Sequence, residues 1–146
     1  MSQRRVIIAV MMVSILLLVP AIQGYSGGVY NQSSGCNCHS GTAAPGATVS
    51  ISGLPTSYDV NKLYQVTVSV SGGVSGSSGG FSLEVDKGTL STGFGLMLVN
   101  VNSNGDSATH SITGSSYRSW SFEWTSPAAG AGIVTFDVAG MTSNDD

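Results

Sequence analysis

The stretch that decides the fold is Leu63–Gly72, LYQVTVSVSG. From Tyr64 to Val70 every second residue is apolar, and the residues between them are polar. A period of two places alternate side chains on one face of a β-strand. The valines in this stretch also suit a pleated, half-buried surface. We therefore expect a strand here with one buried face.

Short apolar segments of the same kind, separated by Gly, Pro, Asn and Ser, continue through the chain. They are Ala47–Pro55, Gly80–Asp86, Phe94–Val101, Ala108–Thr113, Ser119–Pro127 and Ala131–Gly140. Phe94–Val101 is apolar almost throughout, which predicts a central strand. Aromatic residues at strand period, Trp120, Phe122 and Trp124 among them, are expected in the core. About seven strands spaced roughly ten residues apart are typical of an all-β, immunoglobulin-like antiparallel sandwich.

Residues 1–24 have the architecture of an export signal. Arg4 and Arg5 precede Val6–Val19, a 14-residue run that only Ser14 interrupts, and Pro20 ends the run. A spanning helix needs about 20 apolar residues. We therefore expect a cleaved signal helix, with an uncleaved N-terminal anchor as the alternative. Either way the rest of the chain is extracytoplasmic, secreted or at the cell surface, and contacts a membrane only through an uncleaved N-terminal segment.

The sequence thus divides into three parts: a signal peptide or anchor at 1–24, an irregular leader at 25–46 and a β-sandwich at 47–146. The leader contains the N-glycosylation sequon Asn31-Gln32-Ser33. The chain stops at Asp146, directly after the last expected strand, which leaves open whether a C-terminal segment has been truncated.

Charge excludes some partners. Charged residues are 9% of the chain, against about 25% in typical soluble domains. After residue 24, three basic residues stand against eight acidic ones, a net charge of −5. Nucleic acid is therefore not an expected partner. The sequence contains no nucleophile elbow, phosphate loop or catalytic triad pattern, so it gives no basis for an enzymatic activity.

The leader carries the chemistry-bearing motif SGCNCHSG, Ser34–Gly41, with both cysteines of the chain and one of its two histidines. Cys36-Asn37-Cys38-His39 is one residue shorter than the C-x-x-C-H of c-type haem attachment. Two cysteines in an exported chain usually pair, although a disulfide this short is strained. Together with His110 the motif also supplies the donors of a Cys₂His₂ copper or zinc site.

Several segments in order resemble the exported choice-of-anchor domains of bacteria and archaea, which are related to the Reelin N-terminal (Reeler) sandwich. The matching pieces are Gly53-Leu54-Pro55 with Tyr58, Tyr64–Val70, Gly80-Phe81 and Trp120–Gly140. The W-x-F-x-W-x-x-P-A-x-G-x-G-x-V-x-F segment is the specific part. The resemblance covers about residues 35 to 142.

This resemblance implies a Reeler-like fold and, because such domains often carry C-x-x-C-H before the sandwich, a c-type haem for extracytoplasmic electron transfer. Cys36 and Cys38 would then attach the haem, with His39 as proximal and His110 as distal ligand. A redox partner would be expected outside the cytoplasm. The alternative function is a non-redox surface or adhesion module that binds a surface ligand, with the cysteines as a disulfide, as a copper or zinc site, or without a cofactor.

Overall fold

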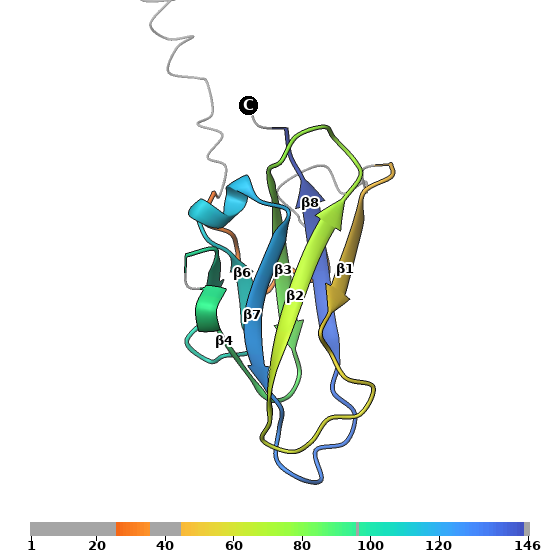
Figure 1. Cartoon of the computed structure of the whole chain (residues 1–146), viewed down its shortest axis with the longest axis vertical. Coiled ribbons are helices and arrows are strands. Elements are labelled where there is room, and N and C mark those ends of the chain that lie inside the picture. Colours follow the sequence, from red (N-terminus) through yellow and green to blue (C-terminus); the bar gives the residue numbers. More distant parts are fainter. Residues whose placement is uncertain (1–25, 36–44, 96, 145–146) are drawn as a thin grey trace, which may run out of the picture.

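Two antiparallel sheets of four strands each pack face to face and enclose the core (Figure 1). The computed structural model describes residues 26–35, 45–95 and 97–144. The first sheet has the strand order β1-β2-β7-β4 and the second has the order β5-β6-β3-β8. The predicted all-β sandwich is therefore confirmed, with eight strands in the described residues instead of about seven.

The first sheet consists of β1 (Thr48–Ser52), β2 (Leu63–Ser71), β7 (Ser119–Thr125) and β4 (Thr89–Ser91). The second sheet consists of β5 (Val99–Val101), β6 (Ser107–His110), β3 (Gly79–Val85) and β8 (Phe136–Thr142). Two 3₁₀ turns, η1 (Gly93–Gly95) and η2 (Thr113–Ser116), complete the elements. In the part of the chain that the structure describes, no helix has the length and apolar character to cross a bilayer.

The core forms where β2 and β7 pair at the centre of the first sheet. Val66 stands opposite Phe122 and Val68 opposite Trp120, and all four side chains are buried. Phe81 of β3 lies across the sandwich from them, with its ring centroid 4.9 Å from that of Trp120 and 5.9 Å from that of Phe122. The alternation in the sequence thus predicted these buried faces correctly.

The predicted central strand Phe94–Val101 is wrong. Phe94 lies in η1 and is 98% exposed, and Met97 lies in a turn, so only Val99–Val101 form a strand. That strand, β5, is at the edge of its sheet. Gly93, the first residue of η1, adopts a φ of 50°, a left-handed conformation that glycine allows at little cost.

The two ends of the sandwich carry different connections between the strands. One end carries η2 and the β2–β3 connection, and the other carries the long β1–β2 and β7–β8 connections (Figure 1). We call the first the η2 end and the second the loop end. At the η2 end Arg118 joins three segments, because its guanidinium donates to the carbonyls of Val74, Ser78 and Ser143 at 2.8 to 3.0 Å.

Candidate functional site

At the loop end, the β1–β2 and β7–β8 connections meet over the edge of the core. The Tyr58 hydroxyl donates to the carbonyl of Gly132 at 2.8 Å and so joins the two connections. The Tyr58 ring packs edge-on against Trp124, with 5.8 Å between ring centroids and 81° between planes. An edge-to-face arrangement at this distance is favourable for aromatic pairs.

Trp124 forms the floor of this end. Its ring stacks on Tyr64 at 5.6 Å and meets the edge of Phe136 at 5.1 Å. The indole N–H donates to the carbonyl of Lys87 at 3.1 Å, so the one polar atom of the ring is satisfied. The Trp124 ring is therefore held in place by contacts with Tyr64, Phe136 and the Lys87 carbonyl.

Between the two connections lies a recess of about 570 Å³, which we call the loop-end recess. Its walls carry no charged side chain; they are formed by Leu54, Pro55, Thr56, Ser57, Tyr58, Val60, Trp124, Gly132, Ile133, Val134 and Phe136. Val60 and Ile133 at its rim are exposed. The lining is uncharged and mixed, with Thr56 and Ser57 beside the apolar and aromatic residues, and the volume lies within the range of about 300 to 1,000 Å³ of small-ligand pockets.

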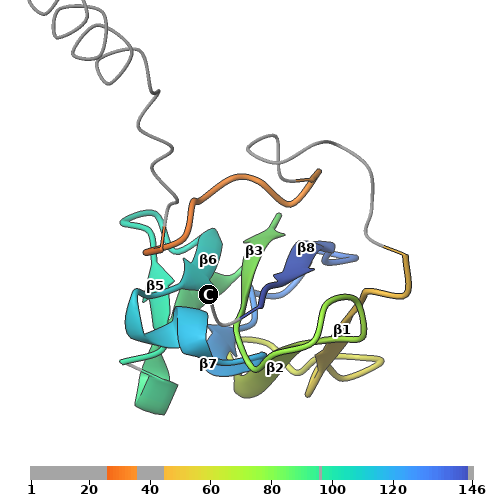
Figure 2. The same ribbon diagram turned by 90° about the horizontal axis from the view of Figure 1, so that it is seen from above.

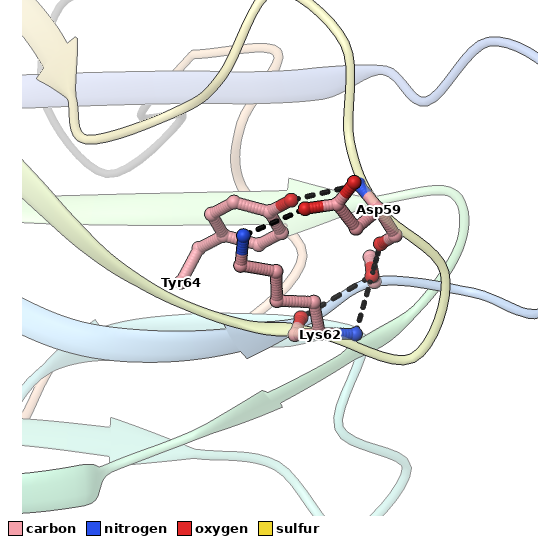
Figure 3. Close-up of polar contacts among 4 residues, drawn as sticks. Asp59, Lys62 and Tyr64 are labelled. Carbon is pink, nitrogen blue, oxygen red and sulfur yellow. Dashed lines mark hydrogen bonds and ion pairs between the residues drawn. The ribbon is translucent and has the colours of Figure 1, made fainter.

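A group of polar contacts fixes the connection that carries Tyr58 (Figure 3). The amide of Asp59 donates to the hydroxyl of Tyr64 at 2.8 Å, and the amide of Lys62 donates to the Ser126 hydroxyl at 2.9 Å. The Ser126 hydroxyl in turn donates to the carbonyl of Asp59, and Ser126 is buried. These bonds hold residues 59–62 against the start of the β7–β8 connection.

The Lys62 ammonium lies 2.6 Å from the Asp59 carboxylate in the same group. The hydrogen bond to that carboxylate, followed by its negative charge, raises the pKa of Lys62. Both side chains are exposed to solvent, and exposed ion pairs contribute little to stability. The charges of this pair therefore offset each other. A second exposed pair, Lys87 and Asp86, also lies beside the recess, because the Lys87 ammonium donates to the carbonyl of Ile133.

His110, the predicted distal ligand, lies at the end of β6 and faces the interior of the sandwich. It is 8% exposed, and its ring centroid is 6.3 Å from that of Trp120 and 6.5 Å from that of Phe81. Its Nδ1 accepts the amide N–H of Phe81 at 3.2 Å. Burial lowers the pKa of His110, and the Phe81 backbone partly opposes this shift.

The ring of His110 has no spare room on the side of β3. A Cβ added at Gly80 would lie 2.6 Å from the imidazole Cε1 and 2.9 Å from Nδ1. On that side the backbone of β3 therefore packs directly against the imidazole, and the Phe81 backbone engages its Nδ1.

The segment before the cysteine motif lies across the outer face of the second sheet. Figure 2 shows this segment, Ser26–Gly35, crossing β5, β6 and β3. Three consecutive amides, those of Asn31, Gln32 and Ser33, donate to side chains of the sheet at 3.0 to 3.2 Å; the acceptors are Ser107 Oγ, Ser82 Oγ and Glu84 Oε1. We call Ser26–Gly35 the leader segment.

The leader segment explains why polar residues on an outer face are buried. Ser82, Ser107 and Thr109 are at most 4% exposed, although strand alternation places them on the side away from the core. The sequon also lies here: Asn31 is exposed, but the Ser33 hydroxyl donates to Glu84 at 2.6 Å. The irregular leader expected from the sequence is thus, in its described part, an ordered cover on the sheet.

The remaining predicted ligands, Cys36, Cys38 and His39, lie outside the described residues. The leader segment that precedes them is on the outer face of the second sheet, whereas His110 points to its inner face. Within residues 26–35, 45–95 and 97–144, no three His, Cys, Asp or Glu side chains form a group that could hold a metal ion. The haem, metal and disulfide hypotheses for the motif remain predictions.

Solved structures of one class of domain share this fold. The crystal structure of the Reelin-N domain of F-spondin aligns with a TM-score of 0.52 and 19% identity, over 82% of this chain and 81% of that chain. Two crystal structures of the human F-spondin reeler domain, fragments 1 and 2, align with TM-scores of 0.51 at 20% and 22% identity. They cover 68% of this chain and 77% and 80% of their own chains, respectively.

No protein-family model matches the chain, and no curated protein matches it. The structural likeness establishes the fold: the chain is a Reeler-like β-sandwich, and that part of the predicted resemblance is confirmed. The relation to choice-of-anchor domains stays a prediction.

Proposed function

We propose that this chain is an extracytoplasmic binding module that recognises a partner through the loop-end recess. The observation that carries the proposal is the uncharged recess of about 570 Å³ between two long connections. The Tyr58–Gly132 bond and the Ser126 contacts fix both connections. The export signal read from residues 1–24 supports a location outside the cytoplasm, and the Reeler-like fold is compatible with it.

The lining of the recess selects an uncharged, apolar group. A charged group entering it would lose hydration without finding an opposite charge on the described walls, which is costly. Aromatic and branched side chains, by contrast, would offer such a group dispersion contacts on several sides. We therefore expect the partner to insert an apolar side chain or a small apolar moiety rather than a charged one.

A neutral solvatochromic dye, Nile red, tests the recess directly. The full chain should bind it saturably, and V60E and I133E should abolish the emission increase by placing a carboxylate at the rim. V74E is the matched control, because Val74 is an exposed valine at the opposite end. The proposal fails if V60E and I133E bind the dye as the parent does, or if V74E loses binding equally.

A second proposal is the c-type haem predicted for the leader motif, for which the specific support is the order Cys36, Cys38, His39. The group would supply one-electron transfer to an extracytoplasmic redox partner, with Cys36 and Cys38 as attachment points. His39 and His110 would be the residues that hold its iron. Copper or zinc at the same four residues, and a disulfide without a cofactor, are the competing outcomes.

The visible spectrum of the exported protein, made together with haem-attachment machinery and reduced with dithionite, separates these outcomes. Sharp α and Soret bands that survive denaturation support covalent haem, and C36S/C38S should then remove them. H110N should alter the axial-ligand signature only if His110 is a ligand. Absence of the bands refutes the haem proposal, while metal analysis and thiol titration distinguish a metal site from a disulfide.

A further inference from the structure

The η2 end of the sandwich exposes large apolar side chains from three separate segments. Met97 is 74% exposed and Ile112 71% exposed, while Tyr117 is 49% and Val74 44% exposed. Exposed apolar residues scattered over a surface need no explanation, but a group of them at one place marks a contact surface.

Hydrogen bonds from two side chains to backbone carbonyls place these segments at the same end. The Ser111 hydroxyl donates to the carbonyl of Met97, which places the Met97 turn beside the segment that carries Ile112. At the other side, Arg118 donates to the carbonyl of Val74 at 2.8 Å, which joins the β2–β3 connection to the neighbour of Tyr117. The four exposed side chains therefore belong to one end and not to distant faces.

This end also lacks free charge in the residues that the structure describes. Ser71–Ser78 and Ser111–Tyr117 contain no charged residue. The charge of Arg118 lies against the backbone carbonyls of Val74, Ser78 and Ser143.

The chain enters the sandwich at the same end. A Cβ added at Gly27 would lie 3.4 Å from Ile112 Cγ1, so Gly27 and Ile112 are direct neighbours. Before Gly27, the apolar run Val6–Val19 continues through Pro20, Ala21 and Ile22 as an uncharged stretch of 17 residues, the lower limit of the range of about 17 to 25 for a spanning helix. Residues 23–25 separate this stretch from Ser26 and span at most about 10 Å.

From these observations we infer that the η2 end is a membrane-facing surface. With Val6–Ile22 retained in the bilayer, Ile112, Met97 and Tyr117 lie against the headgroup region of a neutral phospholipid membrane. Tyrosine is well suited to that position, because its ring is apolar and its hydroxyl stays hydrated. The loop-end recess then points away from the membrane, since nine-residue β2 alone separates the ends by about 30 Å.

This inference rests on the extracytoplasmic part of the proposed function and takes the alternative in which residues 1–24 are an uncleaved anchor. It is tested with the full chain in phosphatidylcholine bilayers that contain brominated acyl chains, which quench nearby tryptophan. I112W and Y117W place a reporter at the η2 end, and V60W places one at an exposed position of the loop end. The parent, with Trp120 and Trp124, provides the baseline.

We expect the emission added by I112W and Y117W to be largely lost in brominated bilayers, and the emission added by V60W to be unchanged. Equal quenching at both ends, or none at positions 112 and 117, overturns the inference. An intact mass of the exported protein that lacks residues 1–24 also overturns it. The dye-binding result at the loop-end recess is independent, so failure of the recess proposal is recognised separately.

Discussion

The contact between the leader segment and the second sheet makes a quantitative prediction at Ser82. Its hydroxyl accepts the Gln32 amide at 3.1 Å, and Ser82 is 4% exposed. In S82A the Gln32 amide of the leader segment still faces the sheet but has lost its acceptor. A buried polar group left unpaired costs about 1 to 3 kcal/mol, and Gln32 is only half-buried, so we expect a loss of about 1 to 2 kcal/mol.

The matched control is S69A in β2. The Ser69 hydroxyl contacts the Ser119 hydroxyl at 2.9 Å on the exposed outer face of the first sheet, and no part of the leader segment contacts it in the described residues. Such surface substitutions usually change stability by less than about 0.5 kcal/mol. The two variants thus compare the same serine-to-alanine change on a sheet covered by the leader segment and on the exposed face of the other sheet.

Urea denaturation followed by far-ultraviolet circular dichroism at pH 7 measures both variants. Native-state hydrogen exchange of the Gln32 amide provides the local test, because S82A should accelerate it more than the loss in global stability requires. The reasoning is refuted if S82A and S69A unfold at the same urea concentration and the Gln32 amide exchanges equally fast in both.

Three further predictions concern other contacts. Because burial lowers the pKa of His110 in the folded chain, the unfolded chain protonates this histidine at a higher pH. The stability that depends on neutral His110 should therefore be fully present above about pH 6.5. Below that pH the free energy of unfolding should fall, by at most about 1.4 kcal/mol per pH unit, until the folded-state pKa is reached. H110N should remove that slope in a pH series of urea titrations, and an unchanged slope contradicts the assignment. G80A should destabilise by about 1 to 3 kcal/mol in thermal unfolding, because its Cβ meets the His110 ring, whereas G27A should be tolerated. R118K should cost about 1 to 2 kcal/mol, because an ammonium cannot reproduce the planar fork that serves three carbonyls; a melting temperature equal to that of the parent would show that those bonds are not needed.

The strands that the sequence predicted well are those with one buried face. In β2 and β7 the alternation is uninterrupted because one side meets the core and the other meets solvent. Phe94–Val101 has no such period, and a short apolar run alone does not distinguish a buried strand from an exposed turn. Gly93, just before this run, and Gly95, within it, were the local signal against a strand.

The leader segment and the recess depend on contacts between distant parts of the sequence. Ser82 and Ser107 have the pattern of solvent-facing strand positions, and nothing local shows that residues 31–33 cover them. Tyr58 and Gly132 are 74 residues apart, and their bond defines the recess. The cysteine motif, in contrast, is conspicuous in the sequence but lies outside the described residues, so its chemistry remains a prediction.

The spacing of the two tryptophans in β7 has a spectroscopic consequence. The indole of Trp120 donates to Gly114 in η2 and lies beside His110, whereas the indole of Trp124 lines the loop-end recess and contacts Tyr58. One strand therefore carries a separate optical reporter for each end of the molecule. W120F and W124F would assign the two emissions, so that protonation in the interior and occupancy of the recess could be followed in the same unlabelled protein.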